Sequence, residues 1–306
     1  MTTNLDPESA LFLADVNRIQ QAISNASAQV SSGLKINVAS DAPDQIDSLL
    51  QLRADEASNT QAQSNLTLAQ TDAQSADSAL GSSILLMDRA VTLATEGASA
   101  TSTATTNADL AQEVQSLQEQ MVSYSQTQVT GRYIFSGDLN SSPSYTLDLS
   151  APNGVDQLSN AASTVQIQNP AGGSFPASLT AQQIFDDQNP DGTPATDNVF
   201  TALNTLRVAL SNNDTAAIGA SITNLQAASD HLNTSEAFYG TVEDRIQDAS
   251  NFSSSYDTQL QTEISQTQDA DVTAEATDLT QANTQLQAAY QAQAEMPKTS
   301  LFQFLG

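Results

Sequence analysis

The sequence has no cysteine, no tryptophan and few cationic residues. Its 306 residues include 8 Lys or Arg against 35 Asp or Glu, giving a net charge of −27. The absence of cysteine excludes disulfides, thiolate metal sites and cysteine nucleophiles. Eight scattered cations cannot line the basic surface that nucleic acid or an anionic bilayer requires. We therefore expect neither of these as a partner.

Long apolar runs are also missing. The longest aliphatic run is Ile84–Met87, far shorter than the roughly 20 residues of a membrane-spanning helix. The N-terminal stretch holds no Lys or Arg before Arg18, and it contains Asp6, Pro7 and Glu8. We expect no membrane insertion and no cleaved signal peptide.

Bulky side chains are scarce. Aromatic residues make up 5% of the chain, and much of the 39% hydrophobic content is alanine. Because an alanine side chain removes little apolar area from water, we expect no single large compact core.

The positions of the prolines divide the chain into a central segment and two flanks. Six of the nine fall within residues 138–196, a segment without Lys or Arg. Stretches rich in Ala and Gln, both good helix formers, lie on each side. We predict a mainly α fold, an elongated antiparallel coiled-coil rod of N- and C-terminal helices with a small inserted β-containing domain. The expected segments are an N-terminal assembly helix and loop (1–42), the two halves of the rod (43–137 and 197–265), the insert (138–196), and a C-terminal assembly helix and tail (266–306).

The first helix is marked by apolar residues three or four positions apart, namely Phe12, Val16, Ile19, Ile23, Ala26 and Val30. This spacing places them on one helix face, and Gly33 ends the helix. Pro43 fits the first turn of a second helix, capped by Ala42. That helix is predicted over about residues 43–96, roughly 80 Å at ~1.5 Å per residue, and it ends at Gly97. The apolar stripe of its second half is Leu66, Ala69, Ala73, Ala76, Leu80, Ile84, Met87, Val91 and Ala94.

Similar stripes predict the remaining helices. A third helix ends before Gly131, a short one follows the insert, a longer one is interrupted at Gly240, and the last is closed by Pro297. The four stripes are Leu110, Val114, Leu117, Met121 and Tyr124; Val199, Leu203, Leu206 and Leu210; Ile218, Ile222, Leu225, Ser229, Leu232, Tyr239, Ile246, Tyr256, Leu260 and Ile264; and Val272, Ala276, Leu279, Asn283, Leu286, Tyr290 and Gln293.

These stripes are thin, since Ala, Ser, Asn and Gln occupy many of their positions. A helix with so little apolar area is marginal alone and needs partners on several sides. Identical copies lying side by side supply such partners. We therefore expect a self-assembling protein whose terminal helices become ordered on assembly.

Three segments carry a family resemblance. The N-terminal loop, part of the second helix and the C-terminal helix resemble those of bacterial flagellins and their hook-associated relatives. The matching residues are Val30-Ser31-Ser32-Gly33-Leu34-Lys35-Ile36-Asn37, Ser40-Asp41-Ala42-Pro43, Arg89-Ala90-Val91-Thr92-Leu93-Ala94, and Asp269-Ala270-Asp271-Val272-Thr273-Ala274-Glu275. The resemblance covers roughly 1–137 and 197–306.

Two further segments indicate which members of the family the chain resembles most. The run from Gln128 to Gly137, with Tyr133-Ile134-Phe135, is similar to the members that join hook to filament, as is the tail from Ser300 to Leu305. Tyr133 to Phe135 is interpreted either as a buried strand or as a contact between subunits.

The resemblance implies a structural, non-catalytic role in motility. A subunit of the flagellum connects hook to filament through helix-mediated self-assembly, as a ring or filament of identical copies beside other hook-associated proteins and flagellin. It is exported unfolded by the flagellar type III system to an extracellular position, after a secretion chaperone has shielded its C-terminal helix. The subunit-contact candidates are Val16, Ile19, Ile23, Val30, Leu34, Ile36, Leu279, Leu286, Tyr290, Leu301 and Leu305. Alternatively, such stripe residues form only an intramolecular core.

Other readings of the whole chain stay open. A filament-forming flagellin belongs to the same class, whereas an unrelated secreted coiled-coil adhesin belongs to another. An enzyme in the insert is a further alternative, although that segment has no His or Cys.

Two local motifs are weighed against simpler interpretations. The run Asp187-x-Asn189-x-Asp191-Gly192 imitates an EF-hand start, but its twelfth position is Asn198 rather than Glu. An ordinary turn is the favoured interpretation. His231, the single histidine, is interpreted as a surface or stripe residue, because no Gly-x-Ser-x-Gly motif accompanies it. We expect no catalytic residue, cofactor or metal.

Overall fold

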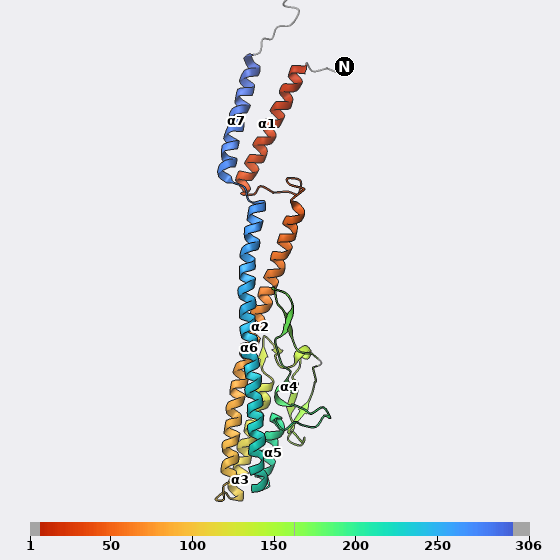
Figure 1. The fold of residues 1–306 in the computed structure, drawn as a ribbon, viewed down its shortest axis with the longest axis vertical. Coiled ribbons are helices and arrows are strands. Elements are labelled where there is room, and N and C mark those ends of the chain that lie inside the picture. The colour runs from red at the N-terminus through yellow and green to blue at the C-terminus, as the bar shows by residue number, and fades with distance from the viewer. Residues whose placement is uncertain (1–6, 162, 296–306) are drawn as a thin grey trace, which may run out of the picture. The chain divides into compact units, whose positions relative to one another are not determined.

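The computed structural model describes residues 7–161 and 163–295 (Figure 1). These residues form long α-helices with a few short antiparallel strand pairs, which confirms the predicted mainly α fold with a small β part. The chain divides into two compact units. Unit 1 comprises Met1–Ser58 and Tyr256–Gly306, and unit 2 comprises Asn59–Ser255.

Helices make up both flanks of the chain. The second and sixth helices are long enough to contribute to both units. The bounds are α1 (Pro7–Ser32), α2 (Ile46–Gly97), α3 (Ala104–Ser125), α4 (Ala181–Phe185), α5 (Val199–Ser211), α6 (Thr215–Gln268) and α7 (Val272–Glu295). The predicted ends of the first two helices, before Gly33 and at Gly97, are confirmed.

Three antiparallel strand pairs lie between α3 and α5 in sequence, each a separate two-stranded sheet. They are β1 (Gln128–Val129) with β2 (Arg132–Tyr133), β3 (Tyr145–Leu147) with β4 (Val155–Gln157), and β5 (Gln166–Gln168) with β6 (Ser174–Pro176). The tight β1–β2 turn uses Thr130 and Gly131 at positive φ, 50° and 78°, as expected for the two central residues of a type I′ hairpin.

In unit 2 the long helices run antiparallel. The Asn59 side chain donates to Ser253 O at 2.9 Å and accepts from Ser253 Oγ at 2.6 Å, while Gly81 faces Glu236. As residue numbers increase along α2, the residues of α6 that lie opposite have decreasing numbers, so the two helices are antiparallel. Every third or fourth residue of α2 faces inward, as the stripe predicted, with these positions buried: Leu66, Ala73, Ala76, Leu80, Met87 and Ala94.

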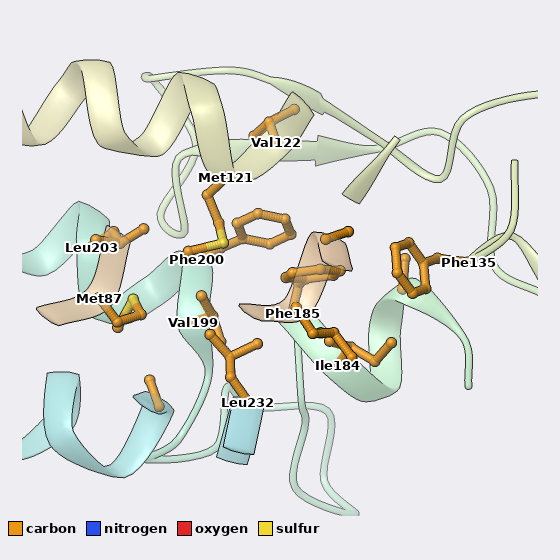
Figure 2. Packing of buried hydrophobic residues seen from close by; sticks show 14 of the residues in the cluster. Met87, Met121, Val122, Phe135, Ile184, Phe185, Val199, Phe200, Leu203 and Leu232 are labelled. Carbon is orange, nitrogen blue, oxygen red and sulfur yellow. The ribbon is translucent and has the colours of Figure 1, made fainter. Parts of the chain in front are cut away.

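The expectation that the chain lacks a large core is wrong for unit 2. One continuous buried cluster joins α2, α3, α5 and α6 to the strand region. Figure 2 shows Met121 of α3, Phe185 of α4 and Phe200 of α5 among its members. The Phe185 and Phe200 rings stack with centroids 5.8 Å apart. All of the buried aromatic residues in the described part of the chain belong to this cluster, a grouping that the average composition does not show.

Two predicted helix details are also wrong. α2 begins at Ile46, because Pro43 lies in a turn in which the Ala42 carbonyl accepts from both Gln45 N and Ile46 N. Gly240 does not interrupt α6. Its neighbours Tyr239 and Val242 are buried in the core, and that packing outweighs the roughly 1 kcal/mol propensity cost of a helical glycine.

Polar groups lock the strand region onto the helices. Buried Asp186 accepts hydrogen bonds from Tyr145 Oη at 3.0 Å and from Asn198 Nδ2 at 2.8 Å. Burial and the neighbouring Asp186 carboxylate raise the pKa of Tyr145 far above its usual value. Arg132 of β2 pairs with Asp72 of α2 at 3.0 Å. Burial raises the pKa of Asp72, although the Arg132 guanidinium opposes the shift.

Candidate assembly surface

The two end helices of the chain pack along each other in unit 1 (Figure 1). Very little of their surface is buried by this contact. Val16 and Ala26 are the buried hydrophobic residues within the described part of α1, and Ala282 is the one in the described part of α7. Two alanines and a valine supply only a small apolar area, so the α1–α7 pair is weakly held on its own.

Six of the predicted contact residues lie on α1 or α7 and are half-buried or exposed. Val16 is buried, whereas five others are half-buried: Ile19, Ile23, Val30, Leu279 and Leu286. Tyr290 is 49% exposed. Leu301 and Leu305 lie outside the described residues. Since much of this apolar surface still faces solvent, it remains available to a further helix.

The remaining two candidates belong to the loop that follows α1. Ile36 is 2% exposed and forms a small cluster with Ala42 and Leu49, against which Ile46 and Ile264 pack. Leu34 is half-buried and pairs in a β-bridge with Asp269. Ile36 therefore acts first as an intramolecular anchor that fixes the loop.

Gln268, the last residue of α6, joins this loop to the end of α6. Its carbonyl accepts from Lys35 N at 2.6 Å and from Ile36 N at 3.3 Å. Its side-chain amide donates to Ile36 O at 3.3 Å and accepts from Arg53 at 2.7 Å. These bonds fix the path of the loop that follows α1.

An acidic residue caps the start of α7. Asp271 Oδ1 accepts from Thr273 N at 3.0 Å and from Ala274 N at 3.1 Å. A carboxylate at this position satisfies free amides and favours the positive end of the helix dipole. Asp271 therefore has a structural task.

Several exposed apolar residues of unit 1 lie outside the set of predicted contact residues. Leu11 and Leu13 on α1 are 68% and 45% exposed, and Leu50 on α2 is 59% exposed. They lie off the apolar stripe, so the helix pattern gave them no role. The sequence did contain a signal for them, namely large apolar residues on a helix face away from its apolar stripe.

The sequence places neither histidine nor cysteine in unit 1. Arg18 and Asp15 form an exposed ion pair at 3.1 Å, a type of pair that contributes little to stability. Within the part of the chain that the structure describes, no helix combines the length and apolarity needed to cross a bilayer.

Solved structures with this fold include flagellar proteins. A Vibrio parahaemolyticus structure, described as a flagellar hook-associated protein, has a TM-score of 0.63 and 18% identity, covering 75% of this chain and 100% of that one. A flagellar hook-associated protein-3 from Legionella pneumophila has a TM-score of 0.60 and 12% identity, covering 72% and 98%. The flagellar junction protein FlgL from the same organism has a TM-score of 0.54 and 12% identity, covering 66% and 99%. At these identities the likeness establishes a shared fold.

Sequence models of one family match both ends of the chain. The bacterial flagellin N-terminal helical region matches residues 8–139, and the bacterial flagellin C-terminal helical region matches residues 199–305. A search of curated protein sequences finds no match. The two matched regions together take in more than three quarters of the sequence, and the chain therefore belongs to the bacterial flagellin family.

Proposed function

We propose that this chain is a structural subunit of the bacterial flagellum that connects the hook to the filament and is required for motility. The observation that carries the proposal is the thin α1–α7 seam, which leaves apolar side chains such as Leu11, Leu13 and Tyr290 exposed. The solved structures of similar fold are described as a hook-associated protein and a junction protein, which supports this position over the body of the filament.

The mechanism is assembly driven by burial. Fully burying a leucine side chain contributes about 1.5–3 kcal/mol, so covering a few exposed residues of α1 and α7 by neighbouring subunits outweighs the weakness of the pair alone. Residues 1–42 and 266–306 act as the assembly segments. The candidates Val16, Ile19, Ile23, Leu279 and Leu286 then contribute to contacts within and between subunits.

The same proposal fixes the partners and the place of action. The subunit contacts identical copies, other hook-associated proteins and flagellin in an extracellular flagellum. It leaves the cell through the flagellar type III system, with a chaperone on its C-terminal helix before export. No reaction is proposed for it.

Electron microscopy of flagella from a strain lacking this chain tests the proposal. The expected result is hooks without attached filaments, restored by the wild-type gene. Filaments of normal length on the deletion strain would contradict the proposal. The adhesin alternative is tested separately, because secretion that persists after the type III system is disabled would favour it.

Purified protein separates the junction role from that of a filament flagellin. Under conditions in which flagellin polymerises, the junction subunit is expected to form short assemblies or to bind filament ends. Unlimited growth of long filaments from this chain alone would favour the flagellin alternative.

A further inference from the structure

A histidine and two aspartates converge where the insert meets α6. Ligand atoms of Asp187, Asp197 and His231 all lie within 4.8 Å of one another, and all three side chains are partly buried. Within residues 7–161 and 163–295, this is the one such group of three. It belongs to unit 2, whereas the candidate assembly surface belongs to unit 1, and its interpretation does not depend on the flagellar proposal.

The hydrogen bond on one ring nitrogen fixes the role of the other. His231 Nε2 lies 2.8 Å from the carbonyl oxygen of Gln183. Because a carbonyl only accepts, Nε2 must carry the proton. In the neutral ring, Nδ1 then points a lone pair toward Asp197 Oδ2, 3.3 Å away. Two lone pairs repel at that distance, so either a proton on Nδ1 or a metal ion must lie between the ring and the carboxylate.

The backbone of the loop is held in place independently of these side chains. Ala195 N donates to Asp187 O at 3.0 Å, and Asn198 Nδ2 donates to the same carbonyl at 2.9 Å. Among the described residues, the Asp187 carboxylate has no hydrogen-bond or ion-pair partner. The insert also has no Lys or Arg to compensate its charge.

We propose that Asp187, Asp197 and His231 Nδ1 form a binding site for a divalent transition metal such as Zn²⁺. With ligand bonds of about 2.0–2.1 Å, tetrahedral Zn²⁺ places its ligand atoms about 3.3 Å apart, which is the observed separation of His231 Nδ1 and Asp197 Oδ2. Asp187 has to approach by at most about 1.5 Å to complete the set, and water fills the fourth position.

The geometry around the ring is typical of a metal-ligating histidine. Such a residue donates its second N–H to a carbonyl or carboxylate, which fixes the tautomer, and Gln183 O accepts that bond here. One imidazole with two carboxylates favours Zn²⁺ over Mg²⁺ or Ca²⁺, which prefer all-oxygen ligands. The metal would join the loop containing Asp187 and Asp197 to α6.

This site differs from the EF-hand-like run and from the expectation that the chain binds no metal. Asp191 Oδ1 accepts from Thr193 N at 3.0 Å and from Thr193 Oγ1 at 2.6 Å. Its carboxylate is therefore occupied within the turn. The second carboxylate of the proposed site, Asp197, lies outside the spaced positions of that run.

The single histidine makes the experiment direct, because every imidazole signal in the NMR spectrum of the untagged full-length protein belongs to His231. Zn²⁺ is added at constant pH in about 0.15 M salt with excess Mg²⁺, which screens weak binding to the acidic surface. We expect the ring signals to shift and to saturate at one equivalent of Zn²⁺. Unchanged ring signals would overturn the proposal.

Variants identify the other ligands by competition with a chromophoric chelator. Asp187→Asn and Asp197→Asn should each weaken Zn²⁺ binding by at least about tenfold, and His231→Gln should abolish the tight site. Asp191→Asn in the same loop is the matched control and should bind as the wild type does. Equal affinity in all four variants would mean adventitious binding and would refute the site.

Discussion

Ile36 and Gln268 exchange hydrogen bonds in both directions. Ile36 N donates to Gln268 O, and Gln268 Nε2 donates back to Ile36 O, each at 3.3 Å. The two residues are 232 positions apart in the sequence, yet together they fix the loop after α1 against the end of α6. The position of the N-terminal helix within unit 1 depends on this contact.

Replacing Gln268 by alanine should loosen this loop. The Gln268→Ala variant keeps the backbone carbonyl but loses the bonds to Ile36 O and Arg53. Because a buried hydrogen bond contributes about 0.5–1.5 kcal/mol, and more to a charged group, we expect roughly tenfold faster amide exchange at Lys35 and Ile36. Gln261→Ala, which removes only a bond to Asp257 one turn away, is the control. Equal exchange in both variants would argue against the contact.

Truncating a core aromatic should destabilise unit 2. Phe200 is fully buried and stacks on Phe185, so Phe200→Ala should lower the free energy of unfolding by about 3–5 kcal/mol. Phe252→Ala, at a ring that is 43% exposed, should have a clearly smaller effect. Urea denaturation measures both, and similar losses would mean that the shared core is not the main source of stability.

The Asp72–Arg132 pair gives a pH dependence with a defined sign. Burial raises the pKa of Asp72 above its ordinary value of 3.8, and Arg132 holds the increase down. In Arg132→Met the pKa should rise further. A raised carboxyl pKa favours the folded state at low pH, and this contribution is lost as pH increases from about 3.8 through the folded pKa. The variant should therefore lose more stability than the wild type between pH about 4 and pH about 7.

Urea unfolding at the two pH values measures this difference. Arg18→Met removes an exposed pair with Asp15, whose side chains are 79% and 65% exposed, and serves as the control. It should show the wild-type pH dependence. A pH profile of Arg132→Met that matches the wild type would contradict the assigned role of Arg132.

A charge on the exposed face of α1 should block assembly without unfolding the subunit. Leu11 is 68% exposed, so Leu11→Glu should leave the circular dichroism of the monomer unchanged while abolishing incorporation into flagella. Leu158→Glu places the same charge at a 53% exposed leucine of the insert and should assemble normally. Normal motility with Leu11→Glu would exclude this face from the contact.

Hydrogen exchange of the free monomer should separate the end helices from the core. α1 has two buried hydrophobic residues and α7 has one among those described, whereas α3 has six: Leu110, Ala111, Val114, Leu117, Met121 and Val122. Because amide protection follows the free energy of local opening, amides of α1 and α7 should exchange much faster than those of α3. Equal protection of the three helices would argue against ordering on assembly.

The sequence alone determined the family and the long helices, apart from the start of α2 and the continuity of α6 at Gly240. Apolar residues at three- and four-residue spacing predicted the inward faces of α2, α3 and α5, because helix periodicity is a local property. The end segments from Val30 to Asn37 and from Asp269 to Glu275 indicated the flagellin family by their residues and order, and the family match at both ends of the chain confirms it.

Only the tertiary structure decided how distant residues meet. Phe135, Phe185 and Phe200 are far apart in the sequence but belong to one core. Packing of α6 against this core keeps the helix continuous at Gly240. His231 meets Asp187 and Asp197 because α6 lies against the insert loop. No local pattern reports such a meeting, since it depends on the folding of segments far apart in the chain.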